Sequence, residues 1–171
     1  STNPFIVYQR LEGASNNQVF FAKMTLGGSV ATAATNITNT AGNLEKPDIY
    51  VSADLWVYVA WQDTTVGKVY YQVFDDIGLP LAGSLPVEVS GDTDQVGVGT
   101  LADGALNPRI QVTDNREVFV SFLQDKGGAV YGLSVWQESG ASMIELVAPA
   151  ENFTDHSLHV DNIHNGIHLL V

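Results

Sequence analysis

The chain repeats itself, and the repeat constrains its fold more than any other sequence feature. The run Pro47-Asp-Ile-Tyr-Val-Ser returns as Pro108-Arg-Ile-Gln-Val-Thr, a shift of 61 residues. At the same shift, Trp56-Val-Tyr-Val-Ala-Trp returns as Glu117-Val-Phe-Val-Ser-Phe. Weaker copies lie upstream and downstream at shifts of about 50 residues, the range typical of repeat architectures. A fixed period of this size indicates one supersecondary unit that is used several times.

Each full unit predicts four short strands separated by turn residues. The run 56–61 is almost entirely apolar, which indicates a strand covered on both faces. No window shows a convincing helical period. The sequence therefore predicts an all-β fold, a β-propeller-like array of four-stranded antiparallel blades. The alternative is a β-sandwich whose strands are similar by coincidence. In the second unit the expected strands are 48–51, 55–62, 68–74 and 85–89.

The repeat is out of phase with both ends of the chain. We expect one domain, 1–171, with units at about 1–45, 46–106 and 107–155 and a partial unit at 156–171. The expected strand count per unit is three, four, four and two, or about three blades plus partial ones. An open strand edge is a template for pairing with another chain. We therefore expect a homo-oligomer or filament, or pairing with the remainder of a longer chain, rather than a closed monomer.

The blade pattern resembles a known family. The series Pro-x-Ile-x-Val, Val-Tyr-Val-Ala-Trp-Gln-Asp, Gly-x-Val-Tyr-Tyr and Asp-x-x-Gly is similar to the blade repeat of sialidase-like (BNR-type) β-propellers. The Asp box of that family, Ser-x-Asp-x-Gly-x-x-Trp, is absent, and 52–54 only echoes its start. The chain has three arginines, Arg10, Arg109 and Arg116, and none lies in a matching motif. The resemblance therefore implies the fold and not sialidase activity.

Composition narrows the partners. Nineteen acidic residues against seven basic ones give a net charge of −12, which argues against nucleic acid and against anionic membrane surfaces. No apolar stretch reaches the roughly 20 residues of a membrane helix. The absence of cysteine excludes disulfides and zinc–thiolate sites. The Asn, Thr, Ser and Gly content suits an extracellular or cell-surface protein. The sequons at Asn36 and Asn152 are the glycosylation candidates.

The step from the second unit to the third carries an insertion between Val89 and Pro108. Inserted loops on rigid scaffolds often carry binding sites. Asp92, Asp94 and Asp103 could offer hard oxygen ligands to Ca²⁺, although their spacing is not that of an EF-hand. Ca²⁺ is the one cofactor that we consider. The alternative is a solvated loop that binds nothing.

Two further groups of residues are candidates for binding. The four histidines gather near the C-terminus, but their spacing disfavours a metal site and favours packed and edge positions. Trp136 follows a predicted third strand near the end of a blade. It is the ring that we expect to be most exposed and available to stack on a sugar. The four histidines are His156, His159, His164 and His168.

No catalytic constellation emerges. Glu138 and Glu145 could form the carboxylate pair of a glycosidase, but nothing in the sequence places them face to face. We therefore expect a non-catalytic extracellular module that binds glycans or a surface, or that builds an assembly. The alternative is a non-catalytic portion of a secreted sialidase-like glycoside hydrolase.

Overall fold

A computed structural model describes residues 3–13, 16–90, 104–125, 131–140, 142–145, 155–161 and 166–170. The regular elements of these residues are all β-strands. No helix in this part of the chain is long and apolar enough to cross a membrane. The strands are β1 (Phe5–Glu12), β2 (Asn16–Met24), β3 (Val30–Asn36), β4 (Leu44–Val51), β5 (Val57–Asp63), β6 (Lys68–Phe74), β7 (Val87–Glu88), β8 (Ala105–Val112), β9 (Val118–Asp125), β10 (Tyr131–Gln137), β11 (Ser142–Glu145), β12 (Ser157–Asp161) and β13 (Gly166–Leu170).

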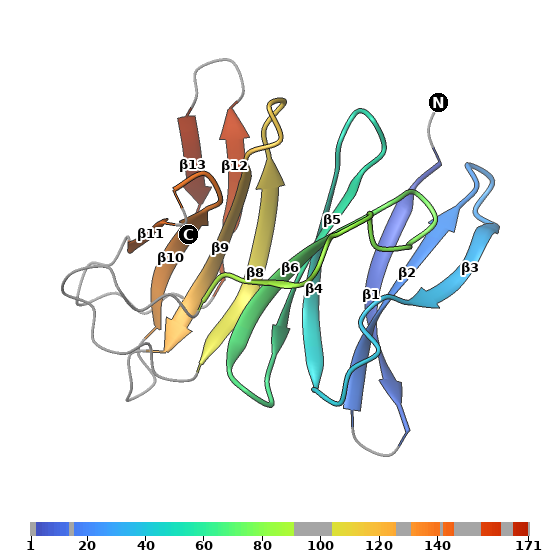
Figure 1. Ribbon diagram of the computed structural model, residues 1–171, viewed down its shortest axis with the longest axis horizontal. Coiled ribbons are helices and arrows are strands. Elements are labelled where there is room, and N and C mark those ends of the chain that lie inside the picture. The colour runs from blue at the N-terminus through green and yellow to red at the C-terminus, as the bar shows by residue number, and fades with distance from the viewer. Residues whose placement is uncertain are drawn as a thin grey trace.

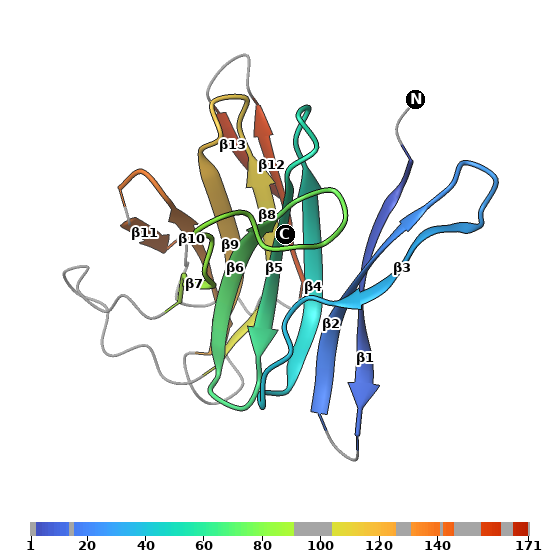
Figure 2. The same cartoon turned by 45° about the vertical axis from the view of Figure 1, so that its right-hand side comes forward.

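The strands form four antiparallel sheets that follow one another in chain order (Figures 1 and 2). Sheet A has the order β1-β2-β3 and sheet B the order β4-β5-β6-β7. Sheet C contains β8-β9-β10-β11, and sheet D contains β12-β13. The strand count of three, four, four and two is the count that the repeat predicts. The predicted all-β array of antiparallel blades is confirmed.

Side-chain alternation along β5 explains why its sequence is apolar throughout. Val59 and Trp61 belong to the core shared with sheet A, whereas Tyr58 and Ala60 belong to the core shared with sheet C. All four side chains are buried. Burying a large apolar side chain stabilises a fold by about 1.5–3 kcal/mol. A strand between two sheets therefore needs apolar residues at every position, as the sequence predicts.

The first strands of sheets B and C carry the same β-bulge, immediately before a proline. Lys46 and Asn107 have φ values of 51° and 50°, in the left-handed region. The backbone N–H of Lys46 donates to Gln9 Oε1 at 2.9 Å, and that of Asn107 donates to Gln62 Oε1 at 2.8 Å. The free backbone N–H of each bulge is thus hydrogen-bonded to a glutamine side chain of the preceding sheet. The repeat therefore encodes the joint between sheets as well as the strands.

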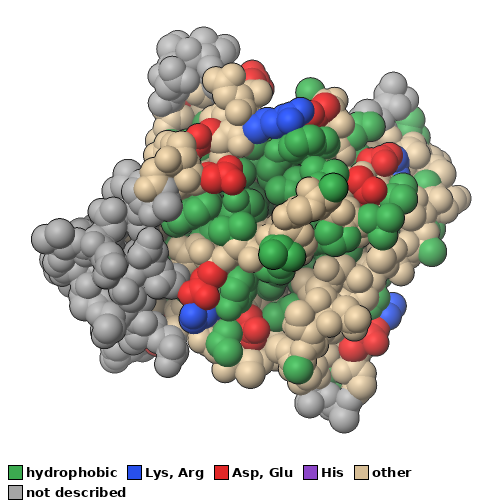
Figure 3. Space-filling view, viewed as in Figure 1, with side chains coloured by type: hydrophobic (Ala, Val, Ile, Leu, Met, Phe, Trp, Pro, Cys, Tyr) green, Lys and Arg blue, Asp and Glu red, His purple; other side chains and the backbone are tan. Residues whose placement is uncertain are grey.

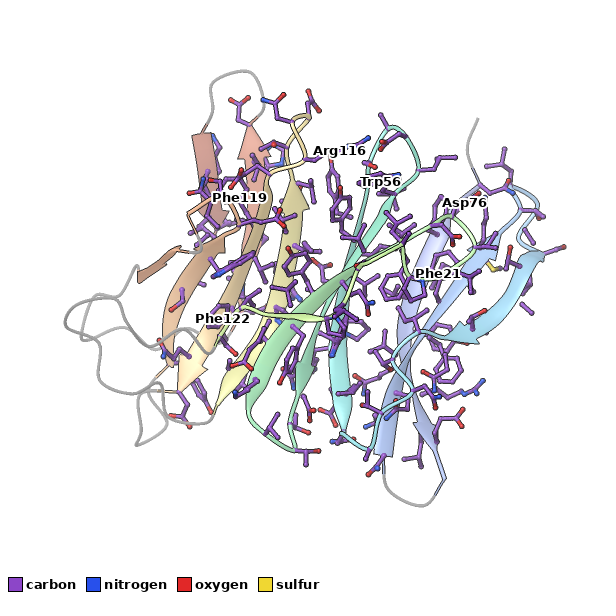
Figure 4. The ribbon with its side chains drawn as sticks, in the orientation of Figure 1. Phe21, Trp56, Asp76, Arg116, Phe119 and Phe122 are labelled. Atoms are coloured by element: carbon purple, nitrogen blue, oxygen red, sulfur yellow. The ribbon has the colours of Figure 1, made fainter. Side chains whose placement is uncertain are left out.

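The turn 75–79 of sheet B packs against sheet A. Gly78 has a φ of 86°, and a Cβ atom there would lie 2.7 Å from the Phe21 ring, so a side chain could not fit. Lys23 Nζ lies 2.6 Å from Asp76 Oδ2 beside this contact. Figure 4 shows Asp76 and Phe21 close together on this side of the molecule. The glycine in this turn therefore serves packing between sheets.

The fourth strand of sheet B is shorter than predicted. We expect residues 85–89, whereas β7 contains only Val87 and Glu88. Pro80 and Pro86 flank the intervening segment, and proline cannot donate a hydrogen bond to a neighbouring strand. Pro80 makes a single isolated bridge to Phe74. Proline chemistry therefore limits the outer edge of this sheet.

Candidate functional site

The turn between β8 and β9 lies between two surfaces that carry clustered polar side chains. Its Thr113 hydroxyl accepts a hydrogen bond from the Glu117 N–H at 3.0 Å. Ser52 does the same for the Trp56 N–H at 3.1 Å in the turn between β4 and β5. The two turns are therefore copies of one unit. Their side chains differ, because the later copy adds Asp114, Asn115 and Arg116.

One surface lies between the two turns. The Arg116 guanidinium lies 3.8 Å from the centre of the Trp56 ring and is paired with Asp54 (Figure 4). The Ser52 hydroxyl and then Arg116 hold the pKa of Asp54 below its usual range. Figure 3 shows Lys or Arg side chains beside Asp or Glu side chains at the edge of a hydrophobic area. Since Arg116 covers one face of the Trp56 ring, that face is not available to a sugar.

Below this surface, sheets B and C are joined by a tyrosine–carboxylate bond. The Tyr71 hydroxyl donates to Glu138 Oε1 at 2.8 Å. Burial, and then Glu138, raises the pKa of Tyr71, so its hydroxyl stays protonated at neutral pH. Glu138 is thus held in a bond between sheets. Glu145, the other carboxylate considered for catalysis, lies in β11, and its side chain is outside the described part of the structure.

The prediction that Trp136 presents an exposed ring is wrong. Its side chain is 5% exposed and lies 5.5 Å from Tyr71, between ring centres, in the core of sheets B and C. β10 continues to Gln137, so Trp136 lies within a strand and not at a blade end. Alternation then directs the ring toward sheet B. In this structure Trp136 stabilises the packing of two sheets and offers no face to a ligand.

The second surface is a crevice between sheets C and D with a volume of about 350 Å³, which we call the C–D crevice. Its polar lining residues come from sheet C and the turn before β9, and the residues that sheet D contributes, Val160 and Ile167, are apolar. None of its described lining residues is Lys or Arg, so the crevice is neutral to acidic. The lining residues are Thr113, Asp114, Asn115, Glu117, Phe119, Gln137, Val160 and Ile167.

The carboxylate of Glu117 is fixed at the wall of the C–D crevice. It accepts a hydrogen bond from the Ser139 N–H at 2.7 Å. Partial burial raises the pKa of Glu117, but the bonds from Ser139 and Gln137 outweigh it and hold the pKa below its usual value. Glu117 is therefore ionised at neutral pH and already oriented. An oriented acceptor among apolar lining residues is common in small-molecule sites.

A further cavity, of about 520 Å³, lies beside the turn that connects β5 to β6. Residues 64–68, Gly104 and Leu106 line it. The one charged side chain in this lining, Lys68, is paired with Glu88 at 2.7 Å. The cavity offers fewer oriented polar groups than the C–D crevice and is the weaker candidate.

Several predicted site residues lie outside the described part of the chain. Asp92, Asp94 and Asp103, the proposed Ca²⁺ ligands, are among them, as are Asn152 and His164. Asn36 is described: its Oδ1 accepts from the backbone N–H groups of Thr38 and Asn39 at 3.1 and 2.9 Å. Glycosylation of Asn36 and Asn152 and Ca²⁺ binding stay predictions.

The structure separates the three described histidines. His156 is buried against sheet C, and its Nε2 lies 2.9 Å from Ser121 Oγ. His159 and His168 pair across β12 and β13 on the outer face of sheet D, with ring centres 6.3 Å apart. Within the described ranges, no group of three or more His, Asp or Glu side chains could hold a metal ion. The histidines thus take packed and edge positions.

Sequence reasoning missed the C–D crevice. Its polar residues are common types with no motif spacing, and they become neighbours only when sheet D packs beside sheet C. One signal could have drawn attention to it. The turn 113–117 repeats the turn 52–56 in register but replaces Ala53 and Leu55 by Asp114 and Arg116. Polar residues that replace apolar ones in one copy of a repeated turn indicate that the two copies have different surroundings or functions.

Comparisons with known proteins support the fold. No protein-family model matches the sequence, and no curated protein sequence matches it. The chain is similar in structure to the endo-arabinase from Bacteroides thetaiotaomicron VPI-5482, with a TM-score of 0.58 and 11% sequence identity. The match covers 96% of this chain and 64% of that chain. At this identity the similarity shows the fold alone: the chain is an all-β array that resembles part of the propeller of a glycoside hydrolase.

Proposed function

We propose that the chain is a non-catalytic, extracellular propeller module that binds neutral glycans in the C–D crevice. The observation that carries this proposal is the lining of the crevice, which combines Asp114, Asn115, Glu117 and Gln137 with apolar residues. Carboxylate and amide groups can pair with sugar hydroxyls, and apolar side chains can contact the C–H face of a sugar ring. A volume of about 350 Å³ lies within the usual range for small-ligand sites.

The charge of the site supports a neutral ligand. The described lining residues include two acidic side chains and no basic ones. The chain as a whole carries a net charge of −12, which repels polyanions at low ionic strength. Sulfated or uronic-acid polymers are therefore disfavoured. The fold of the endo-arabinase supports an arabinose polymer as the first ligand to test.

Binding can be measured by affinity electrophoresis and calorimetry with arabinan, other neutral polysaccharides and polygalacturonate. We expect the native chain to bind a neutral polymer and not the polyanion. The double variant Asp114→Ala/Asn115→Ala should weaken binding by about tenfold or more, or roughly 1.4 kcal/mol. Asp54→Ala is the matched control, because Asp54 occupies in the earlier turn the position of Asn115. Equal loss in both variants would contradict a site in the C–D crevice.

The second candidate is a non-catalytic portion of a secreted glycoside hydrolase. The similarity to an endo-arabinase over 64% of its length favours it specifically. Release of reducing sugar from arabinan separates the two candidates. The isolated chain should bind without turnover under either one. Turnover by the isolated chain would contradict both, and turnover by a longer product of the same gene would favour the hydrolase.

A further inference from the structure

The contact between sheets C and D contains a buried histidine that no other described sheet contact contains. The His156 side chain is 5% exposed, and its partner Ser121 is fully buried. His156 Nε2 lies 2.9 Å from Ser121 Oγ. The other ring nitrogen, Nδ1, is buried and has no hydrogen-bond partner among the described residues. The ring is therefore held in a site that suits its neutral form.

The rest of this contact is small. The apolar core between the sheets contains Phe119 and Val135 from sheet C, and Leu158, Val160 and Leu169 from sheet D. The core between sheets B and C is more than twice as large, with twelve buried residues. Sheet D also has only two strands in the described chain. The docking of sheet D therefore depends on a small apolar core, so a roughly tenfold change in the docking equilibrium (about 1.4 kcal/mol) at the polar joint around His156 is a significant part of the docking free energy.

Burial lowers the pKa of His156 and outweighs the hydrogen bond with Ser121 and the charge of Asp155, which both raise it. Arg109, from β8, donates through Nε to the His156 carbonyl oxygen at 3.2 Å and through Nη2 to Asp155 Oδ1 at 3.0 Å. Asp155 favours a charged ring, but its carboxylate is exposed and already engaged by Arg109 and by the His156 N–H. Ser121, from β9, is not titratable. Burial, and then the Arg109 charge, lowers the pKa of His156.

We propose that His156 is a pH-sensitive joint whose protonation releases sheet D from sheet C. Val160 and Ile167, which line the C–D crevice, belong to sheet D. Release would therefore open the side of the crevice that sheet D forms and weaken ligand binding progressively below the ordinary pKa of histidine. This consequence for binding rests on the proposed function, whereas the release of sheet D does not.

The sign of the effect follows from the two states. When sheet D is docked, His156 stays neutral below its ordinary pKa of 6.5. When sheet D is released, the ring meets water and takes up one proton. Above pH 6.5 the free energy that favours docking of sheet D does not depend on pH. Below pH 6.5 it decreases as the pH falls, until the lowered pKa of the docked ring is reached. One proton taken up corresponds to roughly a tenfold change in the release equilibrium per pH unit.

The test follows the protection of the backbone amides of Leu158 and Val160 against hydrogen exchange, corrected for intrinsic rates, from pH 7.5 to 5.5. In the native chain, we expect protection to fall by about tenfold between pH 7.5 and 5.5, with most of the fall below pH 6.5, while protection in β5 stays constant. His156→Gln keeps an amide near Ser121 but does not titrate. Protection in this variant should change less than twofold over the same range.

The exposed pair on the other face of sheet D provides the matched control. His159 and His168 lie directly opposite each other on β12 and β13. The double variant His159→Gln/His168→Gln should keep the full pH dependence if His156 is the joint. Loss of the dependence in this control, or its persistence in His156→Gln, would overturn the proposal.

A direct measurement covers the case in which His156→Gln does not fold. The ring signals of the native protein give the pKa of each histidine by nuclear magnetic resonance titration. We expect the pKa of His156 to lie below its ordinary value of 6.5. If His156 titrates at or above 6.5 with sheet D still protected, the joint does not exist. Neither readout involves a glycan, so failure here is distinguishable from failure of the proposed binding function.

Discussion

Strands β1 and β5 occupy equivalent positions in two copies of the same unit, yet their burial differs. Gln9 and Gln62 each bond the bulge of the following sheet, which fixes the equivalence of the two strands. Val59, in β5, is fully buried, whereas the corresponding Ile6 is 41% exposed. The burial differs because the two sheets have different numbers of neighbours. Sheet B lies between sheets A and C, whereas sheet A has a sheet on one side only in the described chain. Burial in this fold is therefore a property of the position in the array.

Sheet D shows the same asymmetry on its opposite face. Leu158 and Val160 pack on sheet C, while His159 and His168 face outward. Both sheets at the ends of the array thus bury one face and expose the other. Exposed apolar residues on open strands are unfavourable by about 25 cal/mol per Å² and support the proposal of self-association. The inner sheets carry the stability, and the outer ones carry the surfaces that can change partners.

The largest expected effect comes from placing a charge at the two equivalent positions. Val59→Asp should abolish folding, because an uncompensated buried charge costs roughly 3–5 kcal/mol. Ile6→Asp should cost far less, about 1 kcal/mol or below, because water reaches the strand. Chemical denaturation of both variants measures the difference. Similar losses at both sites would show that β1 is buried in solution, for example by another copy of the chain.

The next effect concerns the glutamines that bond the bulges. Gln62→Ala leaves the N–H of Asn107 without its acceptor in a buried environment, at a cost of about 1–3 kcal/mol. Gln9 is exposed, so water can replace its carbonyl oxygen in Gln9→Ala, and the loss should stay below about 1 kcal/mol. Thermal unfolding of the pair measures the gap. The comparison fails if Gln9→Ala is the more destabilising change.

A third effect tests the tyrosine–carboxylate bond between the inner sheets. Tyr71→Phe removes the bond to Glu138 but leaves the ring in the core, and it should cost about 1 kcal/mol. The matched change between sheets A and B is Asp76→Asn, which removes a partly exposed ion pair with Lys23 and should cost about 0.5 kcal/mol. High salt should reduce the loss of stability caused by Asp76→Asn but not the loss caused by Tyr71→Phe. An equal salt response in both variants would contradict this assignment.

The smallest effect concerns the left-handed residues of the bulges. Lys46→Gly should stabilise the fold by up to about 1 kcal/mol, because glycine adopts a positive φ without steric cost. Asn107→Gly should gain less, because asparagine already tolerates this conformation. Thermal unfolding with matched buffers can resolve the two. A larger gain at Asn107 would mean that the strain at Lys46 is relieved in solution.

The amino-acid sequence is sufficient to predict the repeating unit of this fold. The spacing of Pro47 and Pro108, the apolar run 56–61 and the turn residues predict strands, their order and the coverage of both faces. These features are local, because alternation and turn chemistry act within a few residues. The repeat also predicts the strand count of each sheet. The repeat does not reveal which faces of the repeated units pack against another sheet.

Packing between sheets decides which individual side chains are buried and which line a surface. Trp136 reads as a ring at a blade end but is buried, because sheet B lies against it. Asp114 and Glu117 read as ordinary turn residues but line a crevice, because sheet D lies beside them. His156 reads as a turn histidine but is enclosed by Ser121 and Arg109 from another sheet. In each case the partner is tens of residues away, and the contact depends on packing between sheets, which periodicity within one strand does not encode.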